Sequence, residues 1–125
     1  MISIAVASRL REDRPGYLTA MHASLTLQSA PWEALITLDG ASPGRLPAPL
    51  AKDPRIRTLA PPRPVGAACA RNLALTHVRT PCTNWADDDD VLPAGSLEVR
   101  YQRITETGLR RALQRLRPRS PYLAA

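Results

Sequence analysis

Phenylalanine is absent from this sequence, and aromatic residues of all kinds make up only 4% of its 125 positions. The chain nevertheless contains 44% hydrophobic residues, which is enough for a core built from Leu, Ala, Val and Ile. Intrinsic disorder is therefore excluded as a description of most of the chain. We expect one folded domain of modest size.

Long apolar runs are also missing, because no stretch approaches the roughly 20 residues that a membrane-spanning helix needs. The apolar start, residues 1–7, meets Arg9 too early for a signal peptide. The two cysteines, Cys69 and Cys82, are too few for a disulfide scaffold or a zinc site. We therefore expect a cytoplasmic protein with reduced thiols.

Neither of the common nucleotide-binding loops is present. A G-x-G-x-x-G loop does not follow the first expected strand, and G-x-x-x-x-G-K-[ST] does not occur. The net charge of +6 is typical of nucleic-acid binders, but it lies wholly after residue 99, where seven arginines accompany one acid, Glu106. Because residues 1–99 are neutral, we expect no nucleic-acid partner.

Hydrophobic patterning predicts alternating strands and helices. Strands are expected at 2–7, 32–38, 55–59 and 82–86, and helices at 17–28 and 66–78. This order is typical of an α/β fold with a parallel, Rossmann-like sheet and flanking helices. Ligands of such sheets bind beyond the carboxyl ends of the strands. Here three strands are followed by chemically active residues: Ser8-Arg9, Asp39-Gly40 and the run Asp87-Asp88-Asp89-Asp90.

The four consecutive aspartates repel one another, and a divalent cation would relieve that repulsion. On an extended segment the side chains alternate, so Asp87 and Asp89 are expected to share one face and Asp88 and Asp90 the other. A solvated acidic turn that caps the helix following Pro93 is the other open interpretation. The residues alone do not decide between these two.

Four segments, in this order, resemble the donor-binding half of the family-2 glycosyltransferases of the GT-A type. The resemblance covers about residues 2–99 and includes the Asp-x-Asp metal motif of that family. The segments are Ile4-Ala5-Val6-Ala7-Ser8, Leu38-Asp39-Gly40-Ala41-Ser42, Gly66-Ala67-Ala68-Cys69-Ala70-Arg71-Asn72 and Asp87-Asp88-Asp89-Asp90-Val91-Leu92-Pro93.

The resemblance implies a site for a nucleotide-sugar donor and inverting glycosyl transfer assisted by Mn²⁺ or Mg²⁺. Asp89 would hold the metal on the diphosphate. The donor nucleotide would be bound by Ala7, Ser8, Asp39, Arg71, Asp87 and Asp88. Without the resemblance, Asp39-Gly40 also reads as an ordinary turn, and Arg71 as a solvent-facing helix residue.

The sequence departs from the family pattern after the first strand, at the end of the second strand and after the aspartates. Ala7-Ser8-Arg9-Leu10 replaces the usual turn, and Leu38 stands where a first Asp is usual. After Asp90 the only carboxylates are Glu98 and Glu106, neither in a family-like context, so no catalytic base is identified and the acceptor is unknown. We therefore expect an incomplete, truncated domain, and whether it is an enzyme stays open. The alternative is a non-catalytic nucleotide-binding or protein-interaction module.

Residues 100–125 form an Arg-rich tail in which spaced apolar residues predict a basic amphipathic helix. Such a helix can contact a membrane surface or an acidic partner, or it can pack on the sheet. His22 and His77 are expected to be structural or surface residues. Trp32 and Trp85 are expected to be packing anchors at strand ends.

Overall fold

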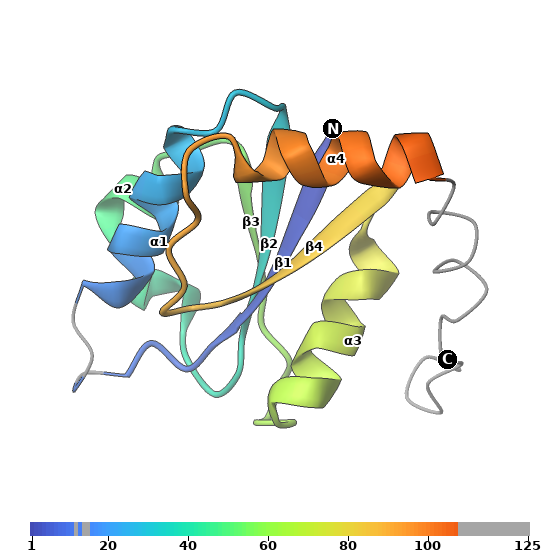
Figure 1. Ribbon diagram of the computed structural model, residues 1–125. Coiled ribbons are helices and arrows are strands. Elements are labelled where there is room, and N and C mark those ends of the chain that lie inside the picture. Colours follow the sequence, from blue (N-terminus) through green and yellow to red (C-terminus); the bar gives the residue numbers. More distant parts are fainter. Residues whose placement is uncertain (12, 14–15, 108–125) are drawn as a thin grey trace.

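The computed structural model describes residues 1–11, 13 and 16–107. Four parallel strands form one sheet in the order β3-β2-β1-β4 (Figure 1). The predicted parallel α/β fold is confirmed. The elements are β1 (Ile2–Ser8), α1 (Tyr17–Thr26), β2 (Trp32–Leu38), the 3₁₀ turn η1 (Pro43–Arg45), α2 (Ala48–Ala51), β3 (Ile56–Leu59), α3 (Ala67–His77), β4 (Cys82–Asp87) and α4 (Ser96–Thr107).

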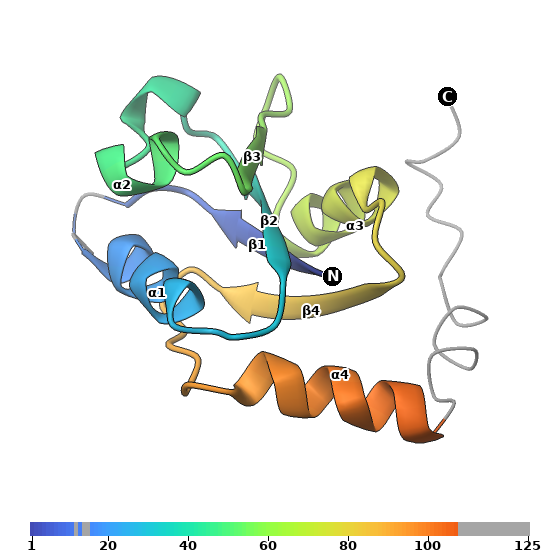
Figure 2. The ribbon, with the colours of Figure 1, turned by 90° about the horizontal axis from the view of Figure 1, so that it is seen from above.

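The two central strands, β1 and β2, are almost continuously apolar because helices cover both of their faces. Helices α1, α2 and α4 lie on one face and α3 lies on the other (Figure 2). The larger core lies on the first face and includes Ile4, Met21 and Ile36. The smaller core, between the sheet and α3, contains Ala5, Leu35 and Ala74.

The carboxyl ends of β1, β2 and β4 meet at one edge of the sheet. Ser8 pairs in register with Leu38, and Ala7 pairs with both Thr37 and Asp87. This edge, toward the bottom of Figure 1, therefore brings together segments that are 30 and 80 residues apart in sequence, as parallel topology requires. Its place agrees with the predicted site.

Two packing expectations have different outcomes. Trp32 is buried, as expected, and lies under the Arg55 guanidinium, which is 4.0 Å from the ring centre. The prediction for Trp85 is wrong, because its side chain is 45% exposed. Trp85 belongs to the outer strand β4, where it pairs with Ala5 of β1. Helix α3 packs mainly on β1 and β2, so it does not cover Trp85.

The Arg-rich tail is described only in part. Helix α4 runs from Ser96 to Thr107 and so crosses residue 99, where the sequence suggested a boundary. The rest of the predicted basic helix, 108–125, lies outside the described residues. Within the described part of the chain, no helix has the length and apolar character needed to cross a membrane.

Candidate functional site

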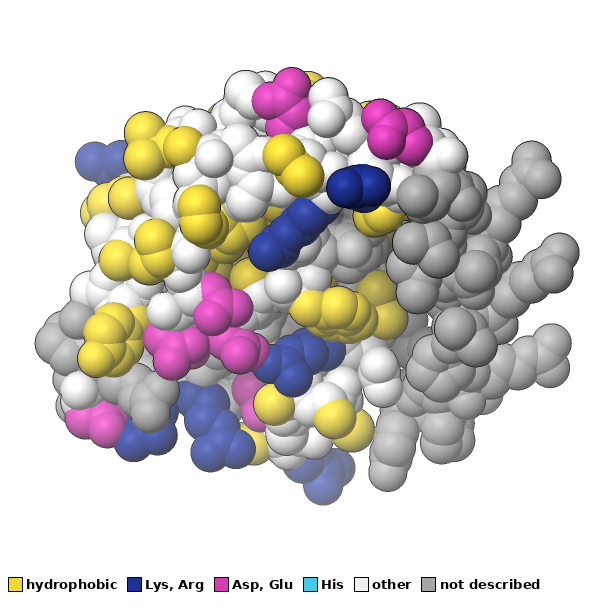
Figure 3. Space-filling view, viewed as in Figure 1, with side chains coloured by type: hydrophobic (Ala, Val, Ile, Leu, Met, Phe, Trp, Pro, Cys, Tyr) yellow, Lys and Arg dark blue, Asp and Glu magenta, His cyan; other side chains and the backbone are white. Residues whose placement is uncertain are grey.

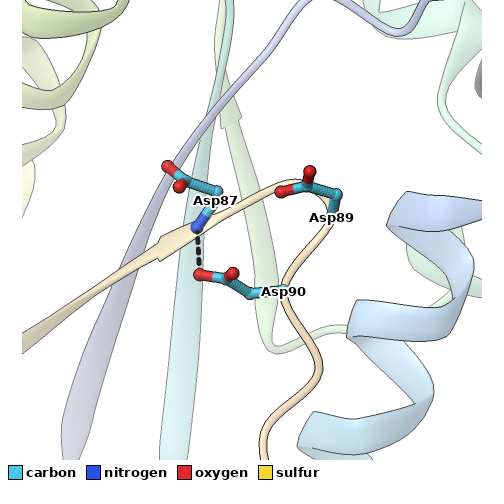
Figure 4. Close-up of side chains that lie close together, drawn as sticks. All are labelled: Asp87, Asp89 and Asp90. Atoms are coloured by element: carbon cyan, nitrogen blue, oxygen red, sulfur yellow. Dashed lines mark hydrogen bonds between the residues drawn. The ribbon is translucent and has the colours of Figure 1, made fainter.

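The four aspartates form a tight turn at the end of β4. The backbone N–H of Asp90 donates to the Asp87 carbonyl at 3.1 Å, and the Asp90 carboxylate accepts from the Asp87 N–H at 2.8 Å. The turn brings the carboxylates of Asp87, Asp89 and Asp90 together, with one oxygen of each within 4.8 Å of the others (Figure 4). All three side chains are exposed.

The alternation expected for this segment is therefore wrong. Side chains alternate only on an extended backbone, and here the chain reverses after Asp87. Asp90, which was expected to face away with Asp88, joins Asp87 and Asp89 instead. Sequence reasoning missed Asp90 for this reason.

Asp88 is directed to the end of β1. Its carboxylate accepts a 2.8 Å hydrogen bond from the Ser8 hydroxyl, and that hydroxyl accepts from the Leu10 N–H at 3.2 Å. Leu10 has a φ of 50°, which is uncommon for a side chain of this size. Ser8 and Asp88 line a small hollow beside the start of α1, together with Arg11 and Arg45.

Asp39 follows β2 and is only 3% exposed. Its two carboxylate oxygens accept hydrogen bonds from the N–H groups of Val65 and Gly66, at 2.6 and 3.0 Å. The Asp39 N–H donates to the Ser8 carbonyl at 2.8 Å. Asp39 therefore ties the end of β1 and the start of α3 to β2. These backbone contacts compensate the cost of burying a carboxylate.

A second link positions α3, since the Thr37 hydroxyl donates to the Ala70 carbonyl at 3.0 Å. The next residue, Arg71, forms an ion pair with Asp87. Its Nε atom is buried and makes no hydrogen bond with any residue that the structure describes. Arg71 is therefore neither a free surface arginine nor a fully hydrogen-bonded one.

Arginines surround the acidic turn and the neighbouring strand ends. The Nε of Arg9 lies 3.9 Å from Asp39, although the Arg9 side chain is 66% exposed. Hydrogen bonds to Asp13 raise the pKa of the Arg11 guanidinium, and Asp88 adds to that effect. Figure 3 shows acidic side chains gathered on the lower part of the visible face with basic side chains beside them. Carboxylates and guanidinium groups thus share one edge of the sheet.

The structure brings nearly all predicted site residues to this edge. Ala7 and Ser8 end β1, Asp39 follows β2, and Arg71 contacts the aspartates that end β4. Ser8 lies between Asp39 and the aspartate turn and bonds to both sides, through its carbonyl to the Asp39 N–H and through its hydroxyl to Asp88. Arg9 follows Ser8 at the end of the first strand but is not among the predicted site residues; the structure places its guanidinium near Asp39.

The model of the family described as Glycosyl transferase family 2 matches residues 3–120. The chain belongs to glycosyl transferase family 2. The family match runs past residue 99, so the family resemblance is longer than the motifs alone indicated. No curated protein gives a significant match to the sequence.

Solved structures confirm the GT-A type of fold. The crystal structure of S. aureus TarS matches with a TM-score of 0.71 and 19% identity, over 86% of this chain and 20% of that one. TarS 1–349 in complex with UDP-GlcNAc gives 0.72 and 21% identity, over 84% and 31%. This family-2 chain therefore spans about a third or less of the length of these structures.

The acidic turn has the chemistry of a site for a small divalent cation. Magnesium and manganese prefer oxygen ligands and keep several waters, so an exposed group of three carboxylates suits them better than a closed cage does. The mutual repulsion of the carboxylates would also fall when a cation binds. The residues present in this family-2 chain therefore fit the metal that its sequence implies.

Proposed function

We propose that this chain binds a nucleotide-sugar donor at the carboxyl edge of its sheet, as the donor half of an inverting glycosyltransferase. The observation that carries the proposal is the convergence of Asp39, Arg71 and the aspartate turn at one edge, in a chain that belongs to family 2. Donor binding is thereby supported by residues from two separate strand ends and from α3.

Each side of the site has its own task. Ala7, Ser8 and Asp39 are assigned to the nucleoside, with Asp88 beside them, because their strand ends meet at this edge. Arg71 supplies a fixed positive charge for the diphosphate, and a guanidinium recognises phosphate oxygens by paired hydrogen bonds. Asp87 and Asp89 lie on the metal side, and the structure adds Asp90 to them.

Mn²⁺ or Mg²⁺ would be held by the carboxylates of Asp87, Asp89 and Asp90. When bound, such an ion stabilises negative charge on a departing nucleoside diphosphate. The protein's own contribution is to hold three carboxylates at one place through the Asp90–Asp87 turn. Asp39 and Thr37 fix α3, so that Arg71 lies beside the same turn.

Uridine nucleotides are the first probes to test. The solved structures of S. aureus TarS 1–349 include complexes with UDP and with UDP-GlcNAc. An identity of about a fifth does not fix the nucleotide base for this chain, so the panel also includes GDP, dTDP and CDP. The contacts of the tail and the expected cytoplasmic location stay predictions.

The alternative, nucleotide binding without catalysis, is favoured by one observation. Glu98 is one of two carboxylates after the aspartates, and it accepts a 2.6 Å hydrogen bond from Ser29, which precedes β2. Glu98 therefore lies toward the amino ends of the strands. It is away from the carboxyl edge of the sheet, where we propose that the donor binds and which we call the donor edge. A general base must lie within hydrogen-bond reach of the hydroxyl that it deprotonates.

Isothermal titration calorimetry with each nucleoside diphosphate, with and without Mn²⁺, tests donor binding. We expect binding that Mn²⁺ strengthens and that Asp89→Asn weakens by at least tenfold, because the variant loses one charged ligand. Glu106→Gln, an exposed change on α4, should bind like the wild type. If a folded sample binds none of the panel at millimolar concentration in Mn²⁺, the proposed function is wrong.

A further inference from the structure

Asp87 belongs to two arrangements at once. Its carboxylate pairs with the Arg71 guanidinium, and it is also one of the three carboxylates that cluster in the turn. A carboxylate oxygen that accepts from a guanidinium is less available to a metal ion. The guanidinium also places a positive charge beside the cluster, and that charge repels a cation.

The surroundings of Arg71 hold this arrangement in place. The start of α3 is fixed by Asp39, and Ala70 is fixed by Thr37, so the backbone that carries Arg71 is anchored to β2. The guanidinium still has a buried Nε that bonds to no described residue. Arg71 can therefore form more hydrogen bonds than it makes with Asp87, and an anion with several oxygens would offer them.

We propose that Arg71 acts as a resident cation that occupies Asp87 and suppresses binding of free metal until a diphosphate arrives. The inference rests on the proposed function and deepens it. A diphosphate attracts both Arg71 and the metal, so its oxygens can take the guanidinium while Asp87 passes to the ion. Metal and nucleoside diphosphate then strengthen each other's binding, and thermodynamic linkage makes that effect equal in both directions.

Two titrations separate the two effects of Arg71. Free Mn²⁺ is measured by electron paramagnetic resonance, first with protein alone and then with protein saturated with UDP. We expect Arg71→Gln to tighten binding of Mn²⁺ alone by about tenfold, the effect of removing a unit charge roughly 5 Å from a divalent ion in water. In the presence of UDP, the same variant should bind Mn²⁺ more weakly than the wild type.

Matched variants isolate the cause. Arg79→Gln removes the same charge from an exposed residue that precedes β4, at the opposite end of the strand, and should leave both titrations unchanged. Arg71→Lys keeps the charge, so it should bind Mn²⁺ alone much as the wild type does. Unchanged or weaker binding of Mn²⁺ alone by Arg71→Gln, or no binding by any variant, would overturn the competition between Arg71 and the metal.

The wild-type chain supplies a second readout should Arg71→Gln fold poorly. The Arg71 Nε–H resonance, observed by nuclear magnetic resonance, should shift during a Mg²⁺ titration with the same midpoint as the metal binding. A resonance that stays fixed while Mg²⁺ saturates the site would contradict the exchange. Failure of every nucleotide to bind would instead contradict the proposed function. The titrations with metal alone would still test whether Arg71 competes with the metal for Asp87.

Discussion

Gly40, directly after Asp39, shows how one small residue shapes the donor edge. Its φ is +84°, and a Cβ added there would lie 3.0 Å from the Cγ of Pro64. The left-handed conformation disfavours other residues, and the proline ring excludes a side chain as well. Pro64 precedes the two residues whose N–H groups bind Asp39, so the close approach helps to seat that segment.

Gly40→Ala should therefore destabilise the fold and weaken donor binding. The positive φ costs about 1–2 kcal/mol for alanine, and displacement of Pro64 adds to that cost. Gly95→Ala is the matched control, because Gly95 has a φ of +78° but no atom within 4 Å of the added Cβ. Urea unfolding should show a clearly larger loss for Gly40→Ala. Equal losses would mean that contact with Pro64 contributes nothing.

The amide side chain of Gln28, just after α1, is one of the links that join α1 to α4. The Gln28 amide group donates to the carbonyls of Ser24, Leu92 and Pro93, at 3.1, 3.3 and 2.9 Å. Its oxygen accepts from the Leu97 N–H at 3.2 Å. The chain between the aspartate turn and α4 is therefore fastened at the point where it leaves the donor edge.

Gln28→Leu should loosen that connection. Buried backbone groups that lose a partner cost about 1–3 kcal/mol, so the free energy of unfolding should fall by that amount. Amide hydrogen exchange at Leu97 should become faster by at least tenfold. Gln102→Leu, an exposed change on α4, provides the control. Unaltered exchange at Leu97 would show that apolar packing alone holds α4.

A second cluster of contacts joins α1 to the segment between α2 and β3. His22 and Asp53 are joined by a 2.8 Å hydrogen bond, and both side chains are 9% exposed. Arg55 donates to both carboxylate oxygens of Asp53 while its guanidinium covers Trp32. The hydrogen bonds from Arg55, aided by His22, hold the pKa of Asp53 well below its usual range.

This depressed pKa predicts how stability depends on pH. A carboxyl group with a lower pKa in the folded state stabilises the protein above the unfolded pKa of about 4. That contribution is lost as the pH falls from the unfolded pKa through the lower pKa of the folded state. Over this range the unfolded chain binds a proton at Asp53 more readily than the folded chain does. Asp53→Asn should make the free energy of unfolding flatter below about pH 4. Chemical denaturation at a series of pH values measures the slope, and an unchanged acid limb would contradict the assignment.

Taken as a unit, the chain combines a well-formed donor edge with few groups for acid–base chemistry. Glu98 is held by Ser29, and Glu106 is exposed on α4. A general base typically contributes a factor of about 10²–10⁴ to the rate, and correct positioning of the acceptor contributes more. Among the residues that the structure describes, no carboxylate beyond the aspartates lies beside the turn to act as such a base.

We therefore expect the chain on its own to release nucleoside diphosphate only slowly, with water as the acceptor. The measurement is UDP release from a donor that binds, with and without candidate acceptors. Glu98→Gln and Glu106→Gln should not change the rate. Fast turnover that depends on an acceptor, unaffected by both variants, would place the catalytic machinery elsewhere in the chain.

The order of strands and the position of the site follow from local sequence patterns. Apolar runs at residues 2–7 and 32–38 need cover on both faces, and a parallel sheet with crossover helices supplies it. Parallel strands then place every carboxyl end at one edge. For this reason the sequence alone predicts that Ser8, Asp39 and the aspartates lie at one edge of the sheet.

The partners of those residues depended on contacts between distant segments. The amides that bind Asp39 lie 26 and 27 residues later in the chain, and Arg71 reaches Asp87 across 16 residues. No local pattern encodes such pairs, because they arise from how α3 packs on the sheet. The exposure of Trp85 has the same origin. Whether a side chain on an outer strand is buried depends on what covers that strand, and the sequence pattern does not show this.

The aspartate turn marks the boundary between the two kinds of information. Its composition offered two interpretations, a cation site or a solvated acidic turn, because four adjacent carboxylates repel one another whatever the backbone does. The backbone reversal after Asp87 decides which carboxylates lie close together, and a pattern that assumes an extended chain does not predict that reversal. Residue types thus set the chemistry available to this protein, and the packing of α3 against β2 and the turn after β4 decided which atoms meet.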